Sequence, residues 1–355
     1  MTIVERSVKD EAEDIQPTHL FASAADQLPL PNGWFPVGFT NEFPMRKVVR
    51  RKLCGEEIIL WRTKKAGLMA SRAYCPHLGG HIGYGGRVRD DLLVCPYHEF
   101  TYDQTGKCTG SGYGTPAPHR TTLSMMEVHE VNHMVFVWHH DQSIGPTWDI
   151  PQVGEDVFTF PVQGGDTSFP VHIRELIENA FDIGHLLPIH NIKPIQMGRL
   201  DQDGAIARLN TYTSMPFLGF DVKFHSAYTA VGLGATFIDS YIPIARIRVL
   251  TSISMTPIDR NLTQVKIGFS ARFTAVKSKA LPPPAKLVDA LTKPLGLAFL
   301  GYINRQAELD RAYFANKCYT NRPALAKGDD LIGPYRRWEK QFYTRVVSDP
   351  NGHRV

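Results

Sequence analysis

The segment Cys75-Pro76-His77 is followed, after seventeen further residues, by the segment Cys95-Pro96-Tyr97-His98. Each segment contributes one thiol and one imidazole. Zinc fingers usually place two cysteines on one arm and two histidines on the other, so this order of residue types argues against zinc. A Rieske [2Fe–2S] cluster has two cysteines on one iron and two histidines on the other. The spacing therefore predicts a Rieske cluster held between two tight loops by Cys75, His77, Cys95 and His98.

The residues beside this quartet indicate which branch of Rieske proteins the chain resembles. Rieske proteins of respiratory complexes add a second cysteine in each loop, and the two cysteines form a disulfide. The corresponding positions here are Gly80 and Tyr97, so no such disulfide is available and the chain resembles the oxygenase branch. Cys54, Cys108 and Cys318 are scattered, which is typical of free thiols in a reducing compartment. We therefore expect a cytoplasmic protein.

A second motif, Asn-x2-Asp-x2-His-x4-His, begins at Asn179 and continues through Asp182 and His185 to His190. The polar residues lie in an apolar run, and residues 174–187 are expected to form one helix that presents Asn179, Asp182 and His185 on a single face. Pro188 is expected to end this helix, so that the next turn brings His190 back toward His185. Two histidines so placed are typical of a mononuclear Fe(II) site with two histidines and one carboxylate.

Together the two motifs resemble those of Rieske non-haem iron oxygenases, in particular their catalytic, alpha-type subunits. The resemblance implies that His185 and His190 bind the catalytic iron and that dioxygen is a co-substrate. It also implies that Asp182 bridges toward a cluster histidine, His98 or His77, of a neighbouring copy. A head-to-tail homotrimer is the assembly that this contact implies. Asn179 matches a family position near the iron whose role varies.

The resemblance also implies a third iron ligand far downstream, in a late helix of the form Gln-x3-Asp-x6-Lys-x-Tyr. The chain has Asp310 at the carboxylate position of this pattern, within the set Gln306, Asp310, Lys317 and Tyr319. Glu308 is the rival carboxylate, but it lies about 200° away around a helix. The stripe that includes Asp310 is otherwise apolar and faces inward, which favours Asp310; its members are Ile303, Ala307, Asp310 and Phe314.

The pattern of short strands and longer helices predicts an α+β protein with two units. We expect a disordered polar tail over residues 1–28, a small antiparallel β Rieske domain over 29–140 and a linker over 141–156. A larger catalytic domain, an antiparallel sheet covered by helices, is expected over 157–355. Strands are expected at 47–53, 57–62, 92–94, 100–103, 125–128, 134–139, 246–256 and 263–274, and a long helical stretch after Pro282–Pro284.

Several features that the sequence lacks limit the kinds of partner that we expect the protein to bind. The net charge of +4 is dispersed, which predicts no nucleic-acid partner. The longest apolar stretch near the C-terminus is far shorter than a membrane span, so no transmembrane segment is expected. No glycine-rich segment opens a βαβ unit of the kind that binds dinucleotides. Electrons are therefore expected from a separate reductase or ferredoxin that draws on NADH or NADPH.

The substrate is predicted only as a class. The spacing and the C-terminal signature resemble 3-ketosteroid 9-alpha-hydroxylase and cholesterol 7-desaturase, with arylamine N-oxygenases almost as similar. This resemblance implies hydroxylation, desaturation or cyclisation of a bulky apolar, polycyclic or steroid-like substrate. The alternative is oxidation or N-oxygenation of a small aromatic or amine intermediate. An alternative of another class is a non-catalytic Rieske electron carrier. Candidate pocket residues are Phe217, Leu218, Phe220, Phe237 and Ile238.

Overall fold

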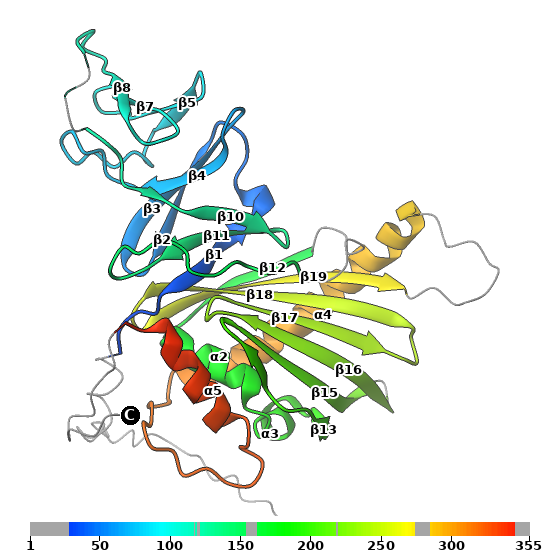
Figure 1. Ribbon diagram of the computed structural model, residues 1–355. Helices are drawn as coiled ribbons and strands as arrows, with labels where there is room; N and C mark the ends of the chain where they lie inside the picture. The colour runs from blue at the N-terminus through cyan, green and yellow to red at the C-terminus, as the bar shows by residue number, and fades with distance from the viewer. Residues whose placement is uncertain are drawn as a thin grey trace, which may run out of the picture.

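The computed structural model describes residues 28–116, 118, 121–153, 162–217, 219–273 and 285–344. The predicted tail therefore lies outside the described residues except for Leu28, which is buried. Among the predicted pocket residues, Leu218 and the side chain of Phe217 also lie outside them. Figure 1 shows two groups of strands. The sheet that runs from β5 (Arg87–Arg89) to β8 (Cys108–Gly110) and helix α3 (Leu186–His190) lie at opposite ends of the molecule.

In the part of the chain that the structure describes, the N-terminal group forms three small antiparallel sheets. The first pairs β1 (Gly33–Phe39), β11 (Met134–His139) and β10 (Val128–Val131). The second pairs β2 (Val48–Leu53), β3 (Glu56–Thr63), β4 (Gly67–Arg72) and β9 (Met125–Met126). The third pairs β5 (Arg87–Arg89), β6 (Leu92–Val94), β7 (Thr101–Tyr102) and β8 (Cys108–Gly110), and the short helix η1 (Thr40–Glu42) follows β1. The predicted small antiparallel β unit is confirmed.

The β2–β3 hairpin shows how the local sequence determines this unit. Cys54 and Gly55 form its two-residue turn, and both have positive φ, of 52° and 82°. Two consecutive positive φ values match a type I′ turn, whose twist suits the flanking strands and which favours glycine. The turn also contacts the C-terminal sheet, because the Cys54 backbone N–H donates a hydrogen bond to the carbonyl of Pro257 at 2.6 Å.

The C-terminal group is one antiparallel sheet with strand order β12-β19-β18-β17-β16-β15-β13, and β14 pairs with β15. Its strands are β12 (Val162–Phe169), β13 (Lys193–Met197), β14 (Asp201–Asp203), β15 (Ile206–Phe217), β16 (Phe220–Val231), β17 (Ala235–Ile242), β18 (Ile247–Asp259) and β19 (Leu262–Phe273). The two strands predicted at 246–256 and 263–274 are confirmed as β18 and β19. Neighbouring strands along the chain pair directly from β15 to β19, so short turns suffice to build the sheet.

The two faces of this sheet have different partners because side chains alternate along a strand. Phe237 and Leu250 pack with Trp34 and Trp138 of the N-terminal group in one hydrophobic cluster. Phe237 is 1% exposed in that cluster, so its predicted place in a substrate pocket is wrong. The other face includes Phe269, which belongs to the core that also holds the helical side chains Leu300 and Phe314.

Four α-helices accompany the sheet in the described residues: α2 (Ile173–Phe181), α3 (Leu186–His190), α4 (Ala285–Phe314) and α5 (Ile332–Glu339); the last continues into η2 (Lys340–Phe342). Figure 1 shows α4 crossing behind the strands and α2 beside α5. The late helix predicted to carry Asp310 is confirmed as α4. None of the described helices is long and apolar enough to cross a membrane.

The prediction of one continuous helix over residues 174–187 is wrong. Helix α2 ends at Phe181, and its C-cap residue Asp182 has ψ of 90°, outside the helical range. A new helix, α3, starts after His185 and includes Pro188. Proline is tolerated there because the first turn of a helix leaves backbone N–H groups without intrahelical partners. The break turns the chain between the two histidines of the motif.

Candidate cluster site and metal centre

The two loops of the N-terminal quartet are closed by short backbone hydrogen bonds. In the first loop the N–H of Cys75 donates to the carbonyl of Gly80 at 2.9 Å, and in the second the N–H of Cys95 donates to Phe100 at 2.9 Å. The second loop connects β6 to β7, which pair with each other. Each loop is therefore held by its own backbone, and the sheet brings the two together.

The four predicted cluster ligands meet between these loops. The thiols of Cys75 and Cys95 hydrogen-bond to each other, and this bond lowers the pKa of Cys75 while it raises the pKa of Cys95, so the two sulfurs share one proton. The rings of His77 and His98 have centroids 4.8 Å apart. Nδ1 of His77 is buried without a hydrogen-bond partner among the described residues. Two adjacent buried sulfurs and an unpartnered buried imidazole nitrogen suit ligands of a metal cluster.

Gly80 and Tyr97, the positions where a disulfide would need cysteines, lie next to each other in the structure. A Cβ atom built on Gly80 would lie 3.4 Å from Cβ of Tyr97. The Cβ atoms of a disulfide lie about 3.5–4.5 Å apart. Gly80 and Tyr97 therefore occupy the point where the two loops approach each other closely enough for such a bond. Both residues lack sulfur, so the loops are held without a covalent link.

The rim of the quartet is unusually apolar and open to solvent. Leu78 is 70% exposed and Tyr97 is 71% exposed, and Tyr113, whose ring contacts His77 and His98, is also exposed. Both imidazoles are partly exposed as well. The cluster end of the chain is thus a surface that another protein can contact directly.

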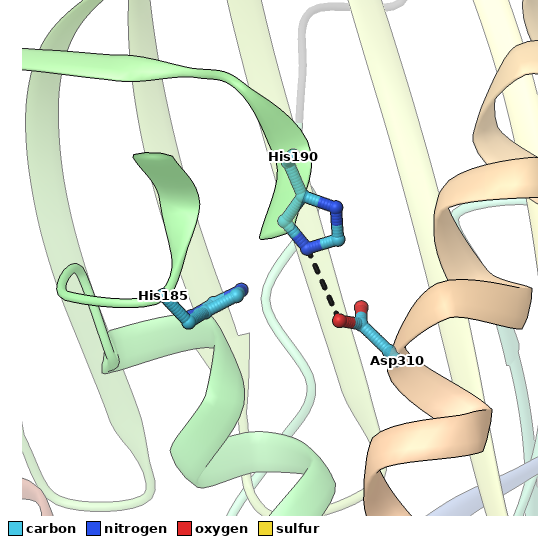
Figure 2. Close-up of side chains that lie close together, drawn as sticks. All are labelled: His185, His190 and Asp310. Carbon is cyan, nitrogen blue, oxygen red and sulfur yellow. Dashed lines mark ion pairs between the residues drawn. The ribbon is translucent and has the colours of Figure 1, made fainter. Parts of the chain in front are cut away.

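The second motif forms a compact group with Asp310. One ligand atom from each of His185, His190 and Asp310 lies within 4.8 Å of the other two. Figure 2 shows the three side chains converging from α3, from its N-terminal end and from α4. Nε2 of His190 lies 3.1 Å from Oδ1 of Asp310. Metal ions bind such atoms at about 2.0–2.2 Å, so one ion fits among the three.

Each imidazole is oriented through its other ring nitrogen. Nδ1 of His190 donates to the amide oxygen of Gln306 at 2.9 Å, and Nδ1 of His185 donates to the backbone carbonyl of Asp182. Metal-binding histidines usually donate this second N–H to a carbonyl or carboxylate, which leaves the remaining nitrogen free to bind. His185 therefore directs an Nε2 lone pair toward the site, whereas Nε2 of His190 hydrogen-bonds to Asp310 and would give up that proton to bind a metal ion. This donor set fits a divalent iron ion.

The two histidines differ in their electrostatic surroundings. Burial lowers the pKa of His185, and the nearby carboxylates of Asp182 and Asp310 offset only part of this effect. Burial acts in the same direction on His190, but the hydrogen bond and charge of Asp310 outweigh it and raise its pKa. His185 is thus held neutral, which is the form that binds a metal.

The remaining predicted residues lie around this triad. The Asn179 amide donates to Asp310 Oδ2 at 3.4 Å, a long hydrogen bond. The Asp182 carboxylate lies 3.8 Å from Nδ1 of His185, and its side chain is 39% exposed. Glu308, the rival carboxylate, points away and pairs with Arg311 at 2.7 Å on the surface. Asp310 is therefore the carboxylate that joins the two histidines.

A buried network of charges, which was not predicted from the sequence, fixes the helix that leads into the triad. Arg336 of α5 makes two hydrogen bonds, at 2.6 and 2.9 Å, to the carboxylate of Glu178 on α2. Lys317, which follows α4, lies 3.1 Å from Glu175 of α2. The Arg174 guanidinium on α2 pairs with Glu339 of α5. These ion pairs hold helix α2 to α5 and to Lys317, which lies just after α4. Helix α4 itself carries Asp310.

Two sequence families match the chain. The Rieske [2Fe-2S] domain matches residues 33–123, which include the whole quartet. The 3-ketosteroid 9alpha-hydroxylase C-terminal domain matches residues 137–343, more than half of the chain, and includes the triad. The first match assigns a [2Fe–2S] cluster to the N-terminal unit.

Curated relatives match along most of the chain. It is 30% identical over 339 residues to cholesterol 7-desaturase 1 of Ciona intestinalis, covering 90% of this chain and 70% of the relative. It is 29% identical to cholesterol 7-desaturase of Drosophila melanogaster, covering 89% and 76%. It is 23% identical to the probable oxygenase component of 3-ketosteroid-9-alpha-monooxygenase from Rhodococcus rhodochrous, covering 88% and 80%.

Solved structures share the fold. NdmA of Pseudomonas putida CBB5 has a TM-score of 0.67 at 16% identity, covering 87% of this chain and 89% of that one. Dicamba monooxygenase bound to dicamba has a TM-score of 0.65 at 17% identity, covering 88% and 97%. At these identities the similarity concerns the architecture of a small β unit joined to a larger sheet with helices. The predicted fold class is confirmed.

Proposed function

The chain belongs to the Rieske oxygenases that carry the 3-ketosteroid 9α-hydroxylase C-terminal domain, and from this premise we propose that it oxidises a bulky, apolar, steroid-like substrate at an iron ion held by His185, His190 and Asp310. The convergence of these three side chains is the observation that carries the proposal. When bound, the iron supplies the activation of dioxygen that oxidation of a C–H bond requires.

The roles of the surrounding residues follow from their contacts. Gln306 and the carbonyl of Asp182 orient the two imidazoles, which keeps each Nε2 directed at the metal. Asn179 restrains the second oxygen of Asp310 and leaves the first for the metal. Because the protein would supply only three ligands, other coordination positions on the iron would stay open for dioxygen, next to the bound substrate. The protein thus supplies binding and orientation.

An apolar substrate is supported by the side chains that extend from the triad along α4. Ile303 and Ala307, on the same helical stripe as Asp310, pack against the main hydrophobic core but are only partly buried, so part of their apolar surface is available beside the triad. Partly buried Tyr228 and Ile253 contribute to this core from the sheet. The named activities of the relatives, on cholesterol and on 3-ketosteroids, agree with a polycyclic substrate.

Electron supply is the second part of the proposal. Cys75, His77, Cys95 and His98 are proposed to hold the cluster, with a separate reductase or ferredoxin, using NADH or NADPH, as the electron donor. The name of the Rhodococcus relative, an oxygenase component, supports a partner of this kind. The exposed apolar rim of the quartet supports direct docking of another protein.

A homotrimer is proposed because the two sites of one chain are far apart. The β5–β8 end and α3 lie at opposite ends of the molecule (Figure 1), so electrons need the cluster of another copy. The exposed carboxylate of Asp182, beside His185, can accept a hydrogen bond from His98 of that copy. A cyclic arrangement repeats this contact until it closes. The division into units at 29–140 and 157–355, with residues 141–156 as linker, belongs to the same proposal.

The decisive experiment compares Asp310→Ala with Glu308→Ala, a matched change two residues away on α4. Wild-type protein is expected to contain about three iron atoms for every two sulfides, because the cluster holds two of each. Asp310→Ala should lose the third iron and sterol-dependent oxygen uptake, yet keep the cluster spectrum. Glu308→Ala should match the wild type, since Glu308 is exposed and pairs with exposed Arg311.

Two outcomes would contradict the proposal. A protein that loses the third iron and keeps every activity would be an electron carrier rather than an oxygenase. Turnover of small aromatic amines, with no product from sterols or ketosteroids, would overturn the substrate class while leaving the iron site intact. Product analysis by mass spectrometry with a generic reductase separates the two.

A further inference from the structure

Two turns of the C-terminal sheet present large apolar side chains to solvent. Phe220, the first residue of β16, is 69% exposed, and Ile244, in the turn between β17 and β18, is 78% exposed. A backbone hydrogen bond from the N–H of Arg246 to the carbonyl of Pro243, at 3.2 Å, closes the second turn around Ile244. Neighbouring exposed apolar side chains usually mark a surface that a partner covers. We call Phe220 and Ile244 the apolar tips.

The apolar tips lie at the same edge of the sheet. β16 and β17 are antiparallel neighbours, and the pair nearest this edge joins His225 to Tyr241. Phe220 precedes this pair on β16, and Ile244 follows it after β17, so both residues lie beyond the pair in the same direction. Figure 1 shows the two turns at the right-hand side of the sheet, away from the N-terminal group. One continuous surface can therefore contact both tips at once.

The first tip continues into the sheet face that meets the helices. Side chains alternate along a strand, so Phe220, Val222 and Phe224 share one face of β16. Tyr228 lies further along the same face and packs against the main hydrophobic core. Phe220 is exposed, whereas the other three are partly buried. Ser226 interrupts the row, but its hydroxyl is hydrogen-bonded to a serine of β17 at 2.7 Å. The row thus runs from solvent into the core.

The second tip leads to the same core. Ile242 and Ile247, on either side of the β17–β18 turn, pair with each other and pack against the main hydrophobic core. Ile303 and Ala307 of α4 pack against this core as well, on the stripe that carries Asp310. The apolar tips are therefore the outer end of the apolar side chains that extend toward the helix of the proposed iron site.

A lipid bilayer is the partner whose chemistry fits these tips. Proteins that lie on a membrane insert apolar side chains at the boundary between headgroups and acyl chains, while their charged side chains stay among the headgroups. Asp221 and Lys223 are exposed beside Phe220, on the other face of β16, and supply such charged groups. The ammonium group of Lys223 can pair with an anionic headgroup. A steroid-like substrate also dissolves far better among acyl chains than in water, so a bilayer holds the substrate too.

We propose that the apolar tips dock the protein on a lipid bilayer, from which an apolar substrate reaches the triad along the helix-facing side of the sheet. This inference rests on the proposed substrate class, and deepens it by naming the phase from which the substrate is taken. Two inserted side chains bury too little apolar surface for stable anchoring, so the docking is peripheral and reversible.

The test is flotation of the full-length, cluster-loaded protein with vesicles of phosphatidylcholine and phosphatidylglycerol, in a ratio of about 3:1, without substrate. The double variant Phe220→Gln with Ile244→Gln should bind these vesicles at least about tenfold more weakly than the wild type, because it loses both inserted side chains. Both positions are exposed, so iron and sulfide content should equal those of the wild type.

Leu262→Gln is the matched control. Leu262 is 36% exposed and follows the turn after β18, at the opposite end of that strand from Ile244. This change should leave vesicle binding unaltered. Lys223→Gln should weaken binding to the mixed vesicles about fivefold and leave binding to pure phosphatidylcholine vesicles unaltered, since it removes one charge near the headgroups.

Three results would overturn the docking. The wild type would not float with vesicles, Leu262→Gln would weaken binding as much as the double variant, or the double variant would lose only self-association of the chain. The last result would show that a second copy covers the tips. Turnover separates this inference from the proposed function. With sterol embedded in vesicles, kcat/KM of the double variant should fall about tenfold relative to its value with sterol delivered on cyclodextrin. No product from sterol in either form, with vesicle binding intact, would instead overturn the substrate class.

Discussion

The quartet and the triad are assembled over different distances along the chain. The quartet occupies two loops separated by seventeen residues, and each loop is closed by hydrogen bonds of its own backbone. The triad joins two histidines to a helix much later in the chain, and the bond from His190 to Gln306 alone spans 116 residues. One site is thus a local structure, and the other depends on how helices pack.

This difference in assembly determines which substitutions should disturb each site. We therefore expect substitutions in the two cluster loops to alter contacts around the sulfur atoms and to leave the helices of the triad in place. The triad, in contrast, depends on the position of α2 relative to α4, because His185 follows α2 and Asp310 lies on α4. The buried ion pairs that link α2 to α5 and to Lys317 hold this position. Damage far from the metal should therefore affect the triad and spare the quartet.

The largest effect is expected from Arg336→Gln. This change removes the two hydrogen bonds to Glu178 and leaves a buried carboxylate without its main partner. Removal of one member of a buried ion pair costs about 3–5 kcal/mol. The free energy of unfolding should fall by that amount in denaturant titrations, and Co(II) binding at the triad should weaken about tenfold.

Arg337→Gln is the control for this prediction, because Arg337 is the next residue on α5 and is exposed. It should leave both quantities unchanged. The contrast between the two sites would be wrong if Arg336→Gln altered the cluster spectrum as strongly as metal binding at the triad.

A smaller effect is expected at Gln306. Gln306→Ala removes the acceptor that orients His190, while the three metal ligands remain. Loss of such an outer partner typically weakens metal binding by about 10–100-fold. Gln306→Glu should restore much of the affinity, since a carboxylate also accepts from Nδ1. Calorimetric metal titrations check both variants, and equal affinities in Gln306→Ala and the wild type would contradict the proposed orientation.

The smallest effect concerns His172, the N-cap of α2. Its Nδ1 accepts from the Arg174 backbone N–H at 3.3 Å, and Nε2 donates to the carbonyl of Pro29 at 3.2 Å, so the neutral ring has both partners. Burial, with the charge of Arg174, lowers the pKa of His172 to about 4. The unfolded chain binds this proton near pH 6.5. Stability is therefore retained above that pH and lost as the pH falls toward 4.

The expected loss from His172 is about 1.4 kcal/mol at pH 5.5 relative to pH 8. His172→Asn keeps a side-chain oxygen that can cap α2 and does not titrate. The stability difference between wild type and His172→Asn should therefore shift in favour of the variant as the pH falls. Denaturant midpoints at a series of pH values measure this difference, and a constant difference would show that His172 does not act in this way.

The sequence predicted both sites and most of the strands and helices beside them, because these depend on patterns of residues that are close together along the chain. The pattern of short strands revealed the small β unit, and apolar positions around Asp310 revealed the inward face of α4. The continuous helix over residues 174–187 was wrong because the spacing of three polar residues also fits a helix that ends at Phe181 and restarts after His185. Phe237 was misplaced because an aromatic residue in a strand does not reveal which face of the sheet meets which partner.

The amino-acid sequence alone determined the ligand types of both sites, the absence of a disulfide at Gly80 and Tyr97, and the family that these features indicate. These depend on residue identity and on short spacings, which fold locally. The tertiary structure alone decided that Gln306 orients His190 and that Arg336 holds α2 through Glu178. These contacts join residues from separate elements, and their positions are set by the packing of a buried core that local patterns do not specify.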